Sequence, residues 1–192
     1  MSFTINIKNM VCQRCNLVVS QIFSDLGIDL LSVDLGQAVV VEDQLSGAKL
    51  EALDNALQAN GFERIDDKKG GLLERMKTLI IKSIHHQDHF NLSINWSDFL
   101  ADELNYDYSY LSTLFSSVSG ITLEQYIIRQ KIEKAKEYLI YGQLSVKEIA
   151  FKLGYSSVAH LSTQFKKVTG MTPSRFKSSR PMASRKPLDN IM

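Results

Sequence analysis

The chain of 192 residues contains no long hydrophobic run and no start typical of an exported protein. No apolar stretch approaches the roughly 18 residues that suggest a membrane-spanning helix. The opening MSFTINIKN lacks the positive start and the apolar segment of a signal peptide. We therefore expect no membrane partner and a cytoplasmic location. The composition is that of a globular protein, and the length suffices for one large domain or two small ones.

Cysteine is also scarce, because the chain holds only Cys12 and Cys15. In a reducing compartment two cysteines rarely form a structural disulfide, which leaves metal binding or redox chemistry as the expected role. The stretch NMVCQRCN places them three positions apart, where a predicted strand turns into a predicted helix. A helix amino terminus and the nearby Arg14 both favour a thiolate, which is the form that binds metals and attacks electrophiles.

The common catalytic signatures are missing. The sequence has no glycine-rich phosphate loop before a helix, no His-Glu-x-x-His, and no nucleophile and base pair apart from the cysteines. We therefore expect that the chain is not an enzyme. A dithiol oxidoreductase is the one enzymatic alternative that the cysteines leave open.

Positive charge is nearly absent from the first third of the chain and concentrated at its end. Residues 1–66 carry 4 Lys and Arg against 9 Asp and Glu, whereas residues 144–192 carry 9 against 2. The overall net charge of +1 conceals this asymmetry. The carboxy-terminal segment is the part that we expect to contact phosphate groups.

The hydrophobic patterns divide the chain into two domains. Residues 1–66 follow the order β-α-β-β-α-β, which predicts an α+β ferredoxin-like domain. The sequence DDKKGG favours a linker at 67–71. Consecutive helical patterns then predict an all-α domain over 72–178. The tail, 179–192, is rich in Ser, Pro and charge and is expected to be disordered.

An internal repeat lies in the helical part. YLSTLFSSVSGITLEQY at 110–126 aligns with HLSTQFKKVTGMTPSRF at 160–176, with seven identities at an offset of 50 residues. A short helical pattern and a turn precede each copy, so we predict two helix-turn-helix motifs. The segment between the copies has about 20 residues without Gly or Pro and predicts a helix of roughly 30 Å. Such a rod could hold two recognition helices in successive major grooves.

Residues 72–178 resemble the DNA-binding domain of the AraC-type family of bacterial transcription regulators. The stretch IAFKLGYSSVAHLSTQFKKVTGMTPSRFK resembles the family signature over nearly its whole length, and KIEKAKEYL at 131–139 resembles the pattern of its linker helix. The resemblance implies that double-stranded DNA is the partner. It implies base-facing positions at Ser109, Ser112 and Thr113 in the first copy, and at Ser157, Val158, Ala159, His160 and Thr163 in the second.

These positions carry no Arg for the two-pronged contact to guanine, and residues 107–119 contain no basic residue. We therefore expect the second motif to provide most phosphate contacts, through Lys166, Lys167, Arg175 and Lys177. Base reading would rest on thymine methyl groups and on the shape of the duplex. The alternative for the small polar residues is that they are merely solvated.

Residues 3–66 resemble the heavy-metal-associated domain of copper chaperones and metal-transport ATPases. The resemblance rests on Met10, Cys12 and Cys15 and on the pair Gly61 and Phe62. It implies a metal site formed by Met10, Cys12 and Cys15. Cu(I) is favoured because two thiolates satisfy it, and Zn is less favoured because it usually takes four ligands, which a dimer would have to supply. A redox or thiol-reactive sensor and a purely structural pair remain alternatives.

Three histidines, His85, His86 and His89, are expected to be exposed linker residues rather than metal ligands. The combined hypothesis is a transcription regulator whose DNA affinity or polymerase contact responds to a metal or another thiol-directed signal. Contact with RNA polymerase and a homodimer remain open. The alternative is a metal-handling or redox protein whose carboxy-terminal half binds other proteins.

Overall fold

The computed structural model describes residues 2–42, 44–65, 68–86, 95–179, 188 and 191. The chain divides into two compact units, residues 1–79 and residues 80–192. Each unit has its own buried hydrophobic cluster. None of the helices in the described ranges is long and apolar enough to cross a membrane.

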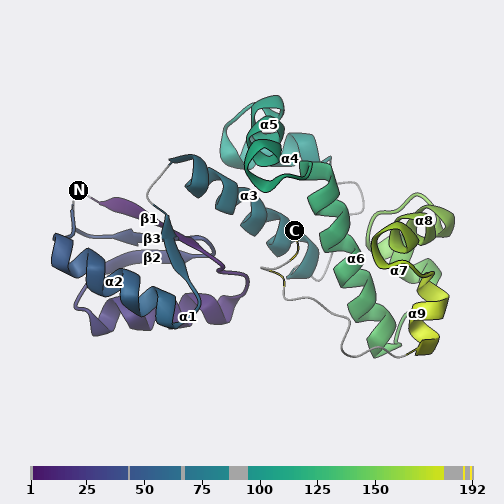
Figure 1. Ribbon diagram of the computed structural model, residues 1–192, viewed down its shortest axis with the longest axis horizontal. Coiled ribbons are helices and arrows are strands. Elements are labelled where there is room, and N and C mark those ends of the chain that lie inside the picture. The colour runs from purple at the N-terminus through teal and green to yellow at the C-terminus, as the bar shows by residue number, and fades with distance from the viewer. Residues whose placement is uncertain are drawn as a thin grey trace. The chain divides into compact units, whose positions relative to one another are not determined.

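The first unit contains a four-stranded antiparallel sheet and two helices between its strands (Figure 1). Its elements are β1 (Phe3–Lys8), α1 (Gln13–Asp25), β2 (Leu30–Asp34), β3 (Gln37–Val40), α2 (Gly47–Ala59) and β4 (Glu63–Ile65). The strands lie in the order β2-β3-β1-β4, and each neighbouring pair is antiparallel. The sequence of elements is therefore the β-α-β-β-α-β order that the hydrophobic patterns predicted.

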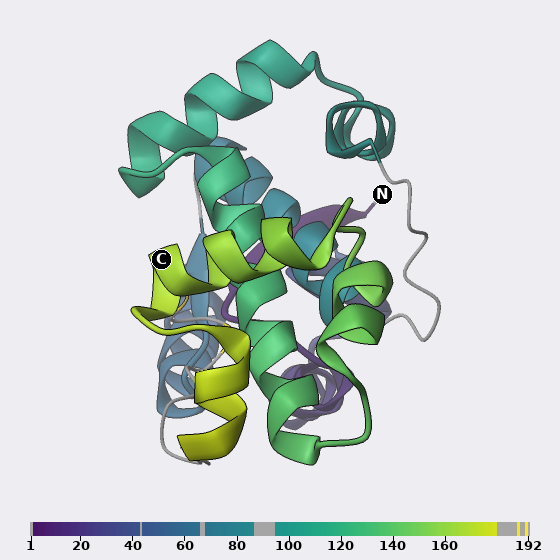
Figure 2. The same cartoon turned by 90° about the vertical axis from the view of Figure 1, so that its right-hand side faces the viewer.

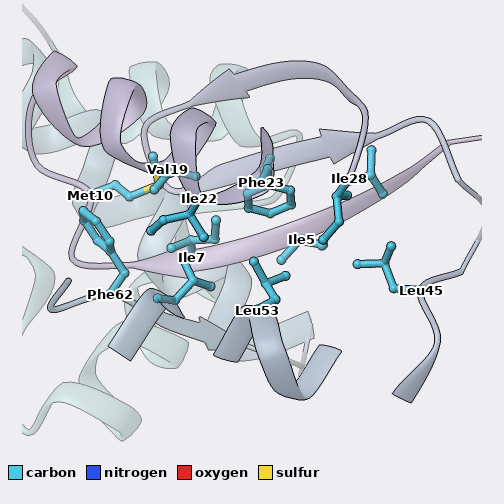
Figure 3. Close-up of a cluster of buried hydrophobic side chains, with 13 residues drawn as sticks. Ile5, Ile7, Met10, Val19, Ile22, Phe23, Ile28, Leu45, Leu53 and Phe62 are labelled. Carbon is cyan, nitrogen blue, oxygen red and sulfur yellow. The ribbon is translucent and has the colours of Figure 1, made fainter. Parts of the chain in front are cut away.

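The core of this unit forms where α1 and α2 cover one face of the sheet (Figure 3). Ile5 and Ile7 of β1 are buried because alternate side chains of a strand point to the same face. Phe23 of α1 and Leu53 of α2 meet them and are both 0% exposed. Burying such side chains stabilises the unit by about 1.5–3 kcal/mol each.

The linker predicted at 67–71 is wrong, because helix α3 (Lys68–His85) begins within it. Leu72, Leu73 and Met76 are buried, so the helical pattern extends further back than the charged and glycine residues suggested. Gly71 has a packing role, since a Cβ atom there would lie 2.5 Å from Nδ2 of Asn6. The boundary between the two units falls inside α3, between Leu79 and Ile80.

Over the described ranges, the second unit continues from α3 with six further helices, seen from a second side in Figure 2. They are α4 (Trp96–Leu104), α5 (Tyr108–Ser119), α6 (Leu123–Tyr141), α7 (Val146–Lys152), α8 (Val158–Thr169) and α9 (Pro173–Ser179). Helices α4 and α5 form the first helix-turn-helix motif, and α7 and α8 form the second. α6 joins them and has 19 residues, which gives about 28 Å at 1.5 Å per residue.

The repeat is present in the structure as well as in the sequence, and helices α5 and α8 match at an offset of 50 residues. α5 and α8 begin and end 50 residues apart, and each is followed by a glycine in the left-handed conformation, Gly120 or Gly170. The aromatic packing also repeats. The rings of Phe115 and Tyr126 lie 5.2 Å apart, and those of Phe165 and Phe176 lie 5.4 Å apart. Both motifs therefore have the same core around α6.

The tail expected to be disordered over 179–192 is partly placed on α6. Ser179 is the last residue of α9, the carbonyl oxygen of Leu188 accepts a hydrogen bond from Gln130, and Ile191 is buried. The other tail residues lie outside the described ranges. At Leu188 and Ile191 the prediction is therefore wrong, because two apolar side chains were overlooked within a polar segment.

Candidate nucleic-acid interface and thiol site

The two cysteines lie together at the amino terminus of α1. Cys12 is the residue before the helix and has an extended backbone, and the N–H of Cys15 donates to the carbonyl oxygen of Cys12. The two Sγ atoms are 3.5 Å apart, and both residues are partly exposed free thiols. The short loop after β1 therefore brings both sulfur atoms to one accessible place.

The pKa values of the two thiols shift in opposite directions. For Cys12, partial burial raises the pKa, but hydrogen bonds from Cys15 and from the Arg14 backbone, with the Arg14 charge, lower it below the ordinary value. For Cys15, burial raises the pKa, and the neighbouring Cys12 adds to the rise. Cys12 is therefore the thiol that ionises first, and the Cys15 thiol can donate a hydrogen bond to it.

The structure does not bring Met10 into this pair as a ligand. Its side chain is 2% exposed and packs in the core near Val19 and Phe62 (Figure 3). The methionine of the motif is thus explained by packing, which sequence spacing alone does not distinguish from metal binding.

The donor set suits some metals better than others. Among the described residues no group of three or more His, Cys, Asp or Glu side chains is placed to hold a metal ion. Two neighbouring sulfur atoms without further ligands fit a soft monovalent cation and leave a four-ligand zinc site incomplete within one chain.

Helix α8 presents one face to its core and the opposite face to solvent. Leu161 and Phe165 are buried, whereas Ala159, His160 and Thr163 are exposed. Ser157 caps the helix, because its side chain accepts a hydrogen bond from the N–H of His160 at 3.1 Å. Each predicted base-facing residue of the second motif is therefore accessible, with Val158 at 39% exposure.

The hydrogen bonds of this surface limit what it can contact. The hydroxyl of Thr163 donates to the carbonyl oxygen of Ala159 at 2.9 Å, which leaves the hydroxyl as an acceptor for a base amino group. The ring of His160 stands edge-on to Tyr155, and its Nδ1 lies 3.2 Å from the hydroxyl of Ser156. The other ring nitrogen of His160 is thus held in a fixed direction.

Basic residues lie at the end of α8 and on the helix that follows it. Lys166 and Lys167 lie in the last turn of α8, and Arg175 and Lys177 lie on α9. All four residues are exposed. Such side chains are the usual partners of DNA phosphates.

Helix α5 occupies the same position in the first motif as α8 does in the second, but it carries no basic side chain. Ser109 and Thr113 are exposed and Ser112 is partly buried, so the predicted positions are accessible in part. The hydroxyl of Thr113 donates to the carbonyl oxygen of Ser109, as Thr163 does to Ala159. Neither α4 nor α5 contains Lys or Arg.

Comparison with known proteins identifies the second unit. A family model described as a helix-turn-helix domain matches residues 100–179. The carboxy-terminal domain of AraT, a response regulator from Geobacillus stearothermophilus, is 25% identical and covers 62% of this chain and 94% of its own, with a TM-score of 0.51. The second unit contains a helix-turn-helix domain.

Two curated relatives of Bacillus subtilis extend the comparison. The uncharacterized HTH-type transcriptional regulator YtdP is 28% identical over 167 residues, which are 84% of this chain and 21% of YtdP. The bifunctional transcriptional activator/DNA repair enzyme AdaA is 35% identical over 83 residues, 43% of this chain and 39% of AdaA. The chain thus spans less than half the length of either relative.

The second unit contains a buried polar cluster that the sequence interpretation missed. Nε2 of His85 lies 3.0 Å from Oε1 of Gln130, and Nε2 of Gln130 donates to the hydroxyl of Tyr126 at 3.0 Å. Burial and the charge of Lys134 lower the pKa of His85 to about 4. The expectation of an exposed linker histidine is therefore wrong for His85, whereas His86 is exposed and His89 lies outside the described residues.

Proposed function

We propose that this chain is a transcription regulator that binds double-stranded DNA through its AraC-type domain. The observation that carries the proposal is the exposed face of α8 beside Lys166, Lys167, Arg175 and Lys177. The names of YtdP and AdaA, a transcriptional regulator and a transcriptional activator, support it. Such regulation also requires that the bound chain recruits RNA polymerase or excludes it from a promoter.

In this proposal the start of α8 enters the major groove. Val158 and Ala159 offer apolar contact to thymine methyl groups, and Thr163 offers an acceptor to adenine N6 or cytosine N4. His160 presents one ring nitrogen to a base edge. The lysines hold the neighbouring phosphates, which fixes the position of the helix on the duplex.

Selection of duplexes from a random-sequence library by the full reduced chain tests this proposal. We expect an enriched motif whose affinity falls as salt increases, because Lys and Arg contacts release counterions from the phosphates. A duplex of the same composition with the motif scrambled is the control. A library that shows no enrichment, together with no binding at low salt, would refute the proposal.

We further propose that the first unit is a ferredoxin-like domain of the heavy-metal-associated type that controls DNA binding through its thiols. The element order, the sheet order and the 3.5 Å separation of the Sγ atoms support this assignment. The two thiolates would hold Cu(I), which supplies a soft positive charge to the loop when bound. The alternative signal is a thiol-directed oxidant. A zinc site of four sulfur ligands would need a homodimer.

DNA affinity measured with and without one equivalent of Cu(I) tests this control. We expect at least a fivefold change for the reduced chain and none for the variant Cys12→Ser/Cys15→Ser. This result would require that the metal discriminates between two states of the protein. An equal response of both proteins would refute thiol control and leave the DNA-binding proposal intact.

A further inference from the structure

The two motifs of the AraC-type domain, defined over 95–127 and 145–177, have opposite charge. The first motif holds no Lys or Arg and five Asp or Glu, whereas the second holds six and one. Because the repeat has a constant offset of 50 residues, each charge can be compared with its counterpart. At one position the sign is reversed, with Asp102 in the first motif and Lys152 in the second.

None of the six basic residues of the second motif has a basic counterpart in the first. The residues at the corresponding positions are Ser97, Asp102, Ser116, Ser117, Gln125 and Ile127. The hydroxyls of Ser116 and Ser117 donate to carbonyl oxygens of their own helix, at 2.8 Å each. A phosphate accepts hydrogen bonds but cannot donate them, so these two hydroxyls have no proton left for it.

The five carboxylates of the first motif remain available to repel DNA. Asp98, Asp102, Glu103, Asp107 and Glu124 are all exposed residues. None of them forms an ion pair within the described part of the chain. A helix in a major groove lies within one Debye length of several phosphates, about 8–10 Å at moderate salt, so screening would not remove the repulsion.

The second helices of the two motifs, α5 and α8, also differ in charge at their amino termini. A helix amino terminus attracts phosphate through its free N–H groups. At α8 this place is held by the neutral Ser157, which caps the helix. At α5 it is held by Asp107, whose carboxylate makes no capping hydrogen bond and adds a negative charge where a phosphate would bind.

We infer that only the second motif reads DNA, and that the first motif stays off the duplex. One molecule then recognises a single major-groove segment instead of two segments one helical turn apart. On this inference Ser109, Ser112 and Thr113 make no contact with bases. The inference rests on the proposed DNA-binding function and specifies the length of the binding site that one chain contacts.

The test selects duplexes from a random library with the full reduced chain and with two matched variants. His160→Ala/Thr163→Ala alters the second motif, and Tyr110→Ala/Thr113→Ala alters the positions 50 residues earlier. We expect one block of selected base pairs, at least a tenfold loss of affinity for the first variant, and less than a twofold loss for the second. Circular dichroism verifies that both variants are folded.

The selection could instead yield two blocks of base pairs about 10 bp apart. The Tyr110→Ala/Thr113→Ala variant then distinguishes two explanations. If Tyr110→Ala/Thr113→Ala removes one block, or weakens binding fivefold or more, α5 reads DNA and the inference is wrong. If both blocks persist in that variant, two chains bind side by side through α8, which supports the inference. If the unaltered chain binds no duplex, the DNA-binding proposal itself fails and the inference fails with it.

Discussion

The two helix-turn-helix motifs have similar buried cores but different surfaces. Phe115 and Phe165 are both fully buried, and each packs against an aromatic ring of the helix that follows. The first motif carries five net negative charges and the second carries five net positive charges. The pattern of buried apolar residues is therefore sufficient to form the motif, whereas DNA binding by such a motif depends on the side chains of its exposed face.

Truncating the matched core phenylalanines should have the largest effect on stability, and the loss should be similar in both motifs. Phe115→Ala and Phe165→Ala each leave a cavity in a buried cluster and should cost about 3–5 kcal/mol of unfolding free energy. Urea denaturation measures this loss. Val118→Ala and Val168→Ala alter exposed residues at matched positions and serve as controls. A cost confined to one motif would contradict the equivalence of the two cores.

Acid should affect the two motifs differently, because Tyr126 of the first motif belongs to a polar cluster with Gln130 and His85. The counterpart of Tyr126 in the second motif is Phe176, which has no hydroxyl. The unfolded chain binds a proton at His85 near pH 6.5, whereas the folded chain does so only near pH 4. Stability at this site is therefore complete above pH 6.5 and falls as the pH drops towards 4, by less than about 3 kcal/mol in total.

Amide hydrogen exchange measured at pH 7 and at pH 5 would test this difference. After correction for the intrinsic exchange rate at each pH, we expect the amides of α5 to lose more protection than those of α8 when the pH falls. His85→Gln should abolish the difference, and His86→Gln should preserve it. Equal acceleration in both helices would show that protonation of His85 loosens the whole domain.

Charge removal at matched positions should affect the second motif alone. Lys166→Ala/Lys167→Ala should weaken DNA binding about tenfold at moderate salt and reduce the salt slope by about 1.8, because two phosphate contacts are lost. Ser116→Ala/Ser117→Ala should change neither quantity. Fluorescence anisotropy at several salt concentrations measures both. A comparable loss for the serine variant would reveal phosphate contacts by the first motif.

The helix caps should give the smallest difference. The Ser157 side chain accepts a backbone hydrogen bond, so Ser157→Ala should cost about 1 kcal/mol. Asp107 makes no such bond, and Asp107→Ala should cost a few tenths of a kcal/mol, from the lost interaction with the helix dipole. Thermal unfolding of the two variants measures both values, and a larger cost for Asp107→Ala would reverse the comparison.

The sequence predicted the order of elements and the two motifs because those features rest on local periodicity and on capping. Thr122 and Ser145, for example, both begin helices with capping boxes, which are local sequence patterns. The errors concern contacts between distant segments. Gly71 lies against Asn6 and His85 lies against Gln130, and in both cases the neighbour is distant in the sequence and absent from any local pattern. Met10 is buried in the core, and its spacing from the cysteines does not by itself distinguish packing from metal binding.

The constant offset of 50 residues has a historical consequence. Helices, caps and terminal glycines of α5 and α8 match without a single insertion or deletion. If the motifs arose by duplication, everything that now separates them is a set of point substitutions in an unchanged frame. Each intermediate between the acidic and the basic motif is therefore a chain of the same length, and the path from one surface to the other can be rebuilt one residue at a time.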